Sequence, residues 1–366
     1  MKFTKYEGVL FKIFIFNIIM NISRLIFILS IIFFIIYNCI NPTFIDLDEF
    51  NNIFNSKMII LPKNFAAFGY KNFQFYVHCT NKHLGFLNVL HSLLNYWIFN
   101  IHLSIKKNSY YFVITLNDGY RELIPYKDIT LKPYKPQFDS FINSNDIKNV
   151  DNNKYPILHK KKYILCFSKR INDPSAICFP DIYYILRNGY KKLLNEIDTN
   201  LVNWTNKKNK LIYRGNNKNG YIYNFINYEN KKKIPRQYFY KKFKNNKLIN
   251  LDNNELSKSK QLKYKYILDI DGYTNSWEGT IWKLYSGSVV IKQKSIWKQW
   301  YYDELKEWVH YVPVNNDFSN LEVIIEWCIN NDTLCEQIAQ NSRQFVKDKL
   351  NKKYVLNQII KNINKI

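Results

Sequence analysis

After about residue 60, apolar residues follow two alternating patterns. The stretch Asn81–Phe99 has apolar residues at helical spacing, which predicts an amphipathic helix. Short apolar runs at Tyr110–Leu116, Tyr163–Ser168 and Leu211–Gly215 predict buried strands. Strands that alternate with helices are typical of parallel sheets covered by helices on both faces. The pattern therefore predicts an α/β fold.

The same alternation continues toward the C-terminus. Tyr266–Lys292 predicts a buried strand, a polar turn, a short helix from about Trp277 and a second strand. A long helix is expected from Ser319, where Ser319 and Glu322 form a capping box. Two blocks of this kind indicate two α/β domains facing a cleft. We expect them at residues 61–205 and 206–340, preceded by a stalk at 42–60 and followed by a C-terminal helix at 341–366.

The N-terminal segment is strongly apolar. Leu25–Ile40 is short of the roughly 20 residues that a membrane span needs, but a span could start near Ile19 if Arg24 reaches the interface. No small-residue cleavage site follows, so residues 1–41 are interpreted as a cytosolic tail with a retained transmembrane anchor. Basic residues precede the segment and acidic residues follow it, which predicts a single-pass type II protein facing an ER- or Golgi-type lumen.

The charge is strongly basic. The net charge is +24, from 53 basic and 29 acidic residues, which suits a nucleic acid or an anionic membrane as partner. An AT-rich genome would also inflate Lys, Asn, Ile and Tyr together. Because the lysines are spread along the chain, no nucleic-acid partner is expected, although a basic surface still favours anionic ligands such as a nucleoside diphosphate.

The cysteines give no sign of a metal site, because no set of Cys and His has zinc spacing. Cys328 and Cys335 are seven residues apart, so they are expected to share one helix face. Cys166 and Cys178 flank a loop. They could pair in an oxidising lumen or remain free buried thiols, and the sequence leaves both open.

Polar residues gather in the connections of Tyr266–Lys292. Ligands of open parallel sheets bind beyond the carboxyl ends of the strands, where Asp269 and Asp271 are expected. Ser276 could cap the following helix, whose free N–H groups would suit a phosphate, and Lys283 lies about two turns further on. The segment predicts a diphosphate-binding edge, although a capped strand–helix–strand unit would share these features. No P-loop or dinucleotide-binding glycine motif is present.

Longer motifs then point to a family. The chain contains "KYILDIDGYTNSWEGTIWKLYSGSVVIK", "WYYDELKEWVHYVPV" and "DFSNLEVIIEW", preceded by "FSKR", "FPD" and "YRGNN". In order and spacing these resemble glycosyltransferase family 90, the lipopolysaccharide-modifying, capsule-associated and protein O-glucosyltransferase group, over about residues 75–350. The resemblance implies a GT-B fold whose first domain faces the acceptor and whose second binds a nucleotide sugar. It also implies an inverting mechanism with no metal and no cofactor.

Inverting sugar transfer needs a general base and groups that stabilise the leaving diphosphate. Asp118 follows a buried strand and matches the family's base, although Asn117-Asp118-Gly119 also reads as a tight turn. Arg214 is the leading phosphate ligand. The expected donor-binding residues are Arg214, Gly215, Asp271, Asn275, Ser276, Trp277, Lys283, Ser286 and Lys292, and Lys169, Arg170 and Asp173 are expected on the acceptor side of the cleft.

The expected function is transfer of a hexose or pentose, glucose or xylose first, from a UDP-sugar to a hydroxyl on a protein or glycan. Two departures from the family leave the sugar and acceptor open. Asn216 stands where the family often has Ser after Arg-Gly, and "SWEGTIWK" lacks the Arg of the animal protein O-glucosyltransferases. The alternative is a catalytically inactive glycan-binding or scaffold protein that retains the fold.

Overall fold

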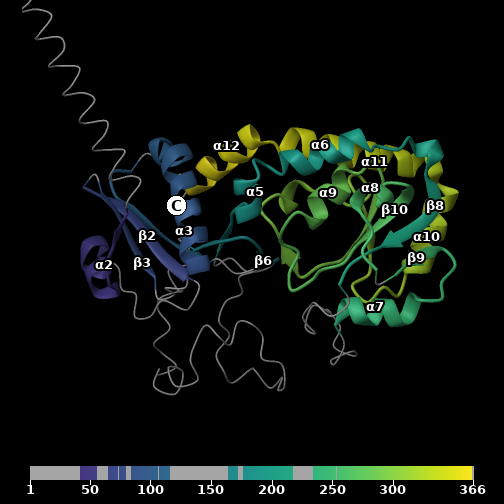
Figure 1. Cartoon of the computed structure of the whole chain (residues 1–366), viewed down its shortest axis with the longest axis horizontal. Coiled ribbons are helices and arrows are strands. Elements are labelled where there is room, and N and C mark those ends of the chain that lie inside the picture. The colour runs from purple at the N-terminus through teal and green to yellow at the C-terminus, as the bar shows by residue number, and fades with distance from the viewer. Residues whose placement is uncertain are drawn as a thin grey trace, which may run out of the picture. The chain divides into compact units, whose positions relative to one another are not determined.

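The structure is a computed structural model, shown in Figure 1. It describes residues 42–55, 65–72, 74–79, 84–105, 107–115, 164–171, 176–216, 234–252 and 254–364. The predicted membrane anchor, Asp118 and Asp173 lie outside these residues. None of the helices in the described ranges is both long and apolar enough to span a bilayer.

The chain forms two compact units, and the first comprises Met1–Ser56, Phe68–His78 and Lys107–Tyr111. It contains β1 (Thr43–Phe44), α2 (Leu47–Phe54) and most of β2 (Phe65–Lys71) and β3 (Gln74–Cys79), together with the start of β4 (Tyr110–Thr115). The strands follow in the order β1-β3-β2-β4. Helix α2 begins where the Asp46 carboxylate accepts a hydrogen bond from the Glu49 amide, and the Phe50 and Phe54 rings pack against Tyr111.

The second unit contains α3 (Leu84–Asn100), which confirms the helix predicted at Asn81–Phe99. Trp97 of α3 is buried against Phe112 and Phe179. The last residues of β4 pair in parallel with β5 (Ile164–Cys166), and β5 pairs in parallel with β7 (Ile177–Cys178). Helices α5 (Ile182–Leu186) and α6 (Lys191–Thr199) follow.

A second sheet follows, and its five strands are all parallel. Its order is β13 (Val312–Val314), β11 (Val289–Gln293), β10 (Tyr264–Asp269), β8 (Lys208–Tyr213) and β9 (Ile249–Leu251). Alternate residues such as Tyr266 and Leu268 join one apolar core with α7 (Pro235–Phe243) and α10 (Leu321–Asn330). Side chains alternate along a strand, so Asp269 faces the opposite side, where it contacts Lys283 of α9 (Gly279–Tyr285). The mixed α/β architecture with parallel sheets is therefore confirmed.

The C-terminal region differs from the prediction. Instead of one long helix from Ser319, α10 ends at Asn330 and α11 (Asp332–Lys349) and α12 (Lys352–Ile363) follow. The prediction of a capping box was wrong, because the residue that precedes the first turn of α10 is Asn320. The Ser319 hydroxyl instead accepts a hydrogen bond from the side-chain amide of Asn315. Figure 1 shows α6 and α11 side by side although they are far apart in sequence, and an ion pair between Arg343 and Asp198 joins them.

The structure shows no disulfide bond at the described cysteines. Cys166 and Cys178 lie opposite each other on β5 and β7 without a disulfide, as the free-thiol alternative expected. Cys328 and Cys335 lie on two helices, α10 and α11, so the prediction of one shared helix face was wrong. The division into domains near residue 205 stays a prediction.

Candidate functional site

The carboxyl ends of three parallel strands bring several of the predicted donor residues to one edge of the five-stranded sheet. Strand β10 ends at Asp269, and Asp271 follows two residues later. Lys292 of β11 is in register with Asp269, and Arg214 follows the last residue of β8. We call these residues and Lys283 of α9 the carboxyl edge.

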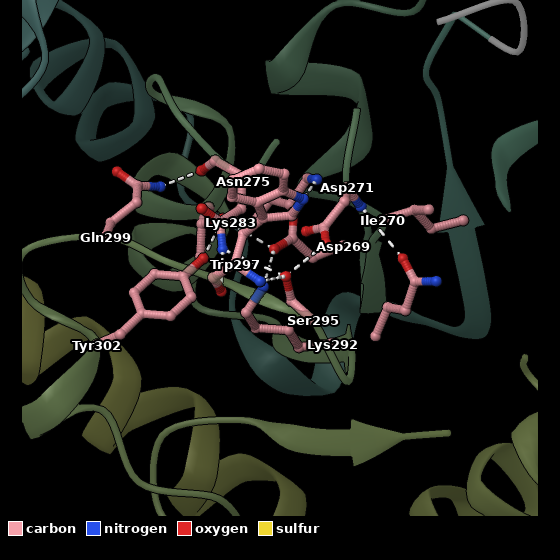
Figure 2. A network of polar contacts seen from close by, with 12 residues as sticks. Asp269, Ile270, Asp271, Asn275, Lys283, Lys292, Ser295, Trp297, Gln299 and Tyr302 are labelled. Carbon is pink, nitrogen blue, oxygen red and sulfur yellow. Dashed lines mark hydrogen bonds and ion pairs between the residues drawn. The ribbon is translucent and has the colours of Figure 1, made fainter. Parts of the chain in front are cut away.

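Asp269 is the centre of a buried ion cluster, shown in Figure 2. Its carboxylate accepts hydrogen bonds from Lys283 Nζ at 2.6 Å, Lys292 Nζ at 3.0 Å and Thr280 Oγ1 at 2.8 Å. All four side chains belong to residues at most 9% exposed. Burial alone would raise the pKa of Asp269, but Lys283 and Lys292 outweigh it and hold that pKa well below its ordinary value. Both lysines are therefore committed to this carboxylate.

Asp271 lies beside this cluster and is 3% exposed. Its carboxylate accepts a hydrogen bond from Ser295 Oγ at 2.5 Å, and its amide donates to Gln293 Oε1 at 3.3 Å. Burial raises the pKa of the Asp271 carboxyl, although Lys292 and the Ser295 hydroxyl act in the opposite direction. Asp271 is thus fixed at the carboxyl edge by Gln293, the last residue of β11, and by Ser295 just after it.

The side-chain amide of Asn275 was expected to bind the donor, but in the structure it is hydrogen-bonded to other parts of the protein. Its Oδ1 accepts from Ser168 Oγ at 2.9 Å, and its Nδ2 donates to the Trp297 carbonyl at 2.6 Å, a contact visible in Figure 2. Its own carbonyl accepts from Gln299 Nε2. These bonds connect three segments: the residues just after β5, the loop after β10, and β12 (Trp297–Lys298). Strand β12 in turn pairs with β6 (Lys169–Arg170). Asn275 therefore joins these segments.

The residues around α9 also differ from the prediction. Helix α9 begins at Gly279 after Glu278, so Ser276 does not cap it, and the Ser276 hydroxyl lies 2.9 Å from Thr274 Oγ1. Trp277 has a positive φ of 75° and packs against Phe167 and Tyr183. Ser286 is buried at the other end of α9, where its hydroxyl donates to the Lys283 carbonyl. The structure does not bring Ser286 to the carboxyl edge.

Arg214 and Gly215 are at the end of β8, as predicted. The Arg214 guanidinium donates to the carbonyls of Tyr213 at 2.8 Å and Asn250 at 2.9 Å, and to Asn250 Oδ1 at 2.6 Å. The side chain is half-buried. A Cβ atom at Gly215 would lie 2.5 Å from the Tyr213 hydroxyl, so a larger residue here would force the Tyr213 side chain to move.

Arg236 is a residue of this edge that the sequence reasoning missed. It lies in the first turn of α7, and its Nε donates to the Asp271 carbonyl at 3.0 Å. Its Nη2 donates to the Ile270 carbonyl at 3.2 Å and its Nη1 to the Asn216 carbonyl at 3.4 Å. The sequence feature that could have indicated this helix is Pro235, a residue favoured in the first turn, followed by Phe239 and Phe243 at helical spacing. The rest of the segment has no clear apolar pattern.

The predicted acceptor-side residues are only partly described. Lys169 Nζ donates to the Ala176 carbonyl at 2.7 Å, and Arg170 pairs with Trp297 through the β6–β12 ladder. Asp118 and Asp173 lie outside the described residues. Within the part of the chain that the structure covers, no three carboxylate, His or Cys side chains are placed to hold a metal ion.

Comparisons with known proteins agree with the motifs. The family model described as "Glycosyl transferase family 90" matches residues 130–365. "Uncharacterized protein 035R" of Invertebrate iridescent virus 3 is 37% identical over 113 residues, which are 30% of this chain and 10% of that protein. "Protein O-glucosyltransferase 1" of Homo sapiens is 34% identical over 88 residues, 24% of this chain and 22% of that protein. The matches thus span only a tenth to a fifth of these relatives.

Solved structures show weaker likeness. A glycosyltransferase from Rickettsia africae ESF-5 is 12% identical, with 59% of this chain and 68% of that one covered and a TM-score of 0.31. Anabaena Alr3699/HepE in complex with UDP-glucose is 11% identical, with 35% of each chain covered and a TM-score of 0.27.

Proposed function

The chain belongs to glycosyltransferase family 90, and from this premise we propose that it transfers a sugar from a UDP-sugar to a hydroxyl group of a protein or glycan. Glucose and xylose are the first candidates for the sugar. The supporting observation is that the family match includes the carboxyl edge, where basic side chains meet at the ends of parallel strands. The proposal includes a GT-B arrangement, inversion at the anomeric carbon and no need for a metal ion.

In the proposed reaction, the acceptor hydroxyl attacks the anomeric carbon while the bond to the diphosphate breaks. The hydroxyl proton passes to a carboxylate, for which Asp118 is the candidate. The leaving diphosphate gains negative charge, which cationic groups at the carboxyl edge stabilise. Arg214 suits this role because it is half-buried and fixed by the carbonyls of Tyr213 and Asn250, so its orientation is set before the nucleotide binds.

The topology proposed for the whole protein is a single-pass type II arrangement with the enzyme body in an ER- or Golgi-type lumen. Its support is the apolar segment Leu25–Ile40 with basic residues before it and acidic residues after it.

Donor turnover by the full chain tests the function. Nucleotide sugars are screened for release of nucleoside diphosphate, with and without EDTA, and NMR of the product gives the anomeric configuration. Asp118→Asn is expected to bind the donor but to lose about 100- to 10,000-fold in turnover. Asp303→Asn, which changes an exposed carboxylate, is the matched control. If folded protein neither binds nor turns over any nucleotide sugar, the inactive glycan-binding alternative is preferred.

A further inference from the structure

Four cationic side chains lie at or near the carboxyl edge, and they differ in what they bind. Lys283 and Lys292 are buried and contact the Asp269 carboxylate at 2.6 and 3.0 Å. Asp271 adds a second carboxyl group close enough to Lys292 for their charges to interact. The two lysines are therefore matched by two acidic side chains, and little of their charge remains for a ligand.

The two arginines are in the opposite situation. Within the described residues, Arg214 donates to the carbonyls of Tyr213 and Asn250 and to the Asn250 amide oxygen, all of them neutral acceptors. The hydrogen bonds of Arg236 within the described residues all go to main-chain carbonyls. No carboxylate of the described residues lies within ion-pair distance of either guanidinium. The Asp271 carboxylate lies close enough to Arg236 for their charges to interact, but neither guanidinium forms an ion pair with a carboxylate of the described residues.

Arg236 is also fixed between the ends of two strands. Its guanidinium binds the Ile270 and Asp271 carbonyls beyond β10, and the Asn216 carbonyl beyond β8. Gly272 leaves room for it, since a Cβ atom there would lie 3.1 Å from Arg236 Nη2. Three of the five guanidinium N–H groups are used in this way, and the other two have no acceptor among the described residues. The side chain is half-buried, so a ligand can reach it.

We propose that Arg236 binds the diphosphate of the nucleotide together with Arg214, and that Lys283 and Lys292 do not contact it. This rests on the proposed function, because it names the groups that hold the donor's phosphates. A fixed, planar guanidinium with unused N–H groups matches phosphate oxygens well. The two lysines instead stabilise the folded edge through Asp269.

The test compares Arg236→Gln and Arg236→Lys with the unchanged full chain. Binding of inorganic pyrophosphate and UDP is measured by titration calorimetry, and binding of uridine by ligand-observed NMR. Arg236→Gln is expected to weaken pyrophosphate and UDP about 10- to 100-fold, because a hydrogen-bonded charged group is lost, and to change uridine binding less than twofold. Arg236→Lys keeps the charge and is expected to fall between. Arg187→Gln removes a cation that is paired with Glu278 and is the control.

Each other result has a distinct meaning. If Arg236→Gln weakens uridine as much as UDP, or leaves UDP binding unchanged, Arg236 only supports the loop and the inference is overturned while the proposed function stands. If the unchanged chain binds pyrophosphate but not UDP, and Arg236→Gln abolishes that binding, the anion contact is upheld and the nucleotide-sugar function fails. If the unchanged chain binds neither, both fail. Should Arg236→Gln not fold, Arg236→Lys gives the same comparison.

Discussion

Replacing Asp269 with Asn removes the carboxylate that compensates Lys283 and Lys292. The two side chains have nearly the same shape, and an Asn oxygen can still accept the hydrogen bond from Thr280 Oγ1. The substitution therefore changes charge rather than volume. Lys292 keeps Asp271 nearby, but no other carboxylate of the described residues lies within ion-pair distance of Lys283. Lys283 would be left as a buried, uncompensated cation.

The size of the effect follows from burial. Asp269 is 5% exposed and Lys283 is 9% exposed, so water does not screen the pair appreciably. Breaking a buried ion pair by removing one partner costs about 3–5 kcal/mol of unfolding free energy. Since about 1 kcal/mol shifts the melting temperature of a large domain by roughly 2–4 °C, we expect a decrease of roughly 6–20 °C.

Urea unfolding followed by circular dichroism, together with thermal unfolding, measures this change. The control is Glu278→Gln, which breaks the half-exposed pairs with Arg187 and Lys258 and is expected to cost about 1 kcal/mol or less. If Asp269→Asn unfolds at the same urea concentration as the unchanged chain, the ion cluster does not stabilise the edge. The two lysines would then be available to a ligand, and the reasoning about Arg236 would lose its basis.

Two further predictions concern other buried polar groups. Lys207 donates to the carbonyls of Leu262 and Ser286 and to Ser288 Oγ, with no carboxylate of the described residues as partner, and burial lowers its pKa from 10.5 to about 7. Between these two pH values the unfolded chain binds a proton that the folded chain does not, so the unfolding free energy should rise from pH 7 to 9.5. Urea unfolding at several pH values should show a shallower rise for Lys207→Met than for the unchanged chain. Equal dependence of the unfolding free energy on pH in both proteins would contradict this. Asn275→Ala leaves the buried Ser168 hydroxyl and Trp297 carbonyl without this partner, so a loss of about 2–5 kcal/mol in urea unfolding is expected. Unchanged stability with lost UDP binding would instead return Asn275 to the donor-binding residues.

The sequence predicted the strands and their edge because both depend on local patterns. Apolar runs such as the one ending at Asp269 identify buried strands, and parallel pairing then brings their carboxyl ends together. The position of Asp271 and Arg214 at one edge could therefore be anticipated. The start of α9 could not, because Ser276 and Gly279 are both acceptable near a helix start and the choice depends on how Trp277 packs against Phe167 and Tyr183.

The partners of polar side chains could not be read from the sequence either. Asn275 was expected to bind ligand because it follows a strand end, yet its partners Ser168 and Trp297 come from segments 107 residues before it and 22 residues after it. Long-range contacts of this kind leave no local pattern. Arg236 was missed for the same reason, because its contacts with Ile270 and Asp271 lie more than 30 residues away.

Those partners also decide which cations can bind a phosphate. For Lys283 to contact a diphosphate, its ammonium would have to leave Asp269, and the carboxylate would stay buried without that charge partner. Such a loss costs about 3–5 kcal/mol, which exceeds the roughly 1.5–3 kcal/mol that one hydrogen bond to a charged group contributes. Arg236 has two unused N–H groups and neutral acceptors for the rest, so a phosphate can bind without breaking an ion pair. The free-energy difference favours the arginines as ligands even though the lysines lie in the more recognisable motif.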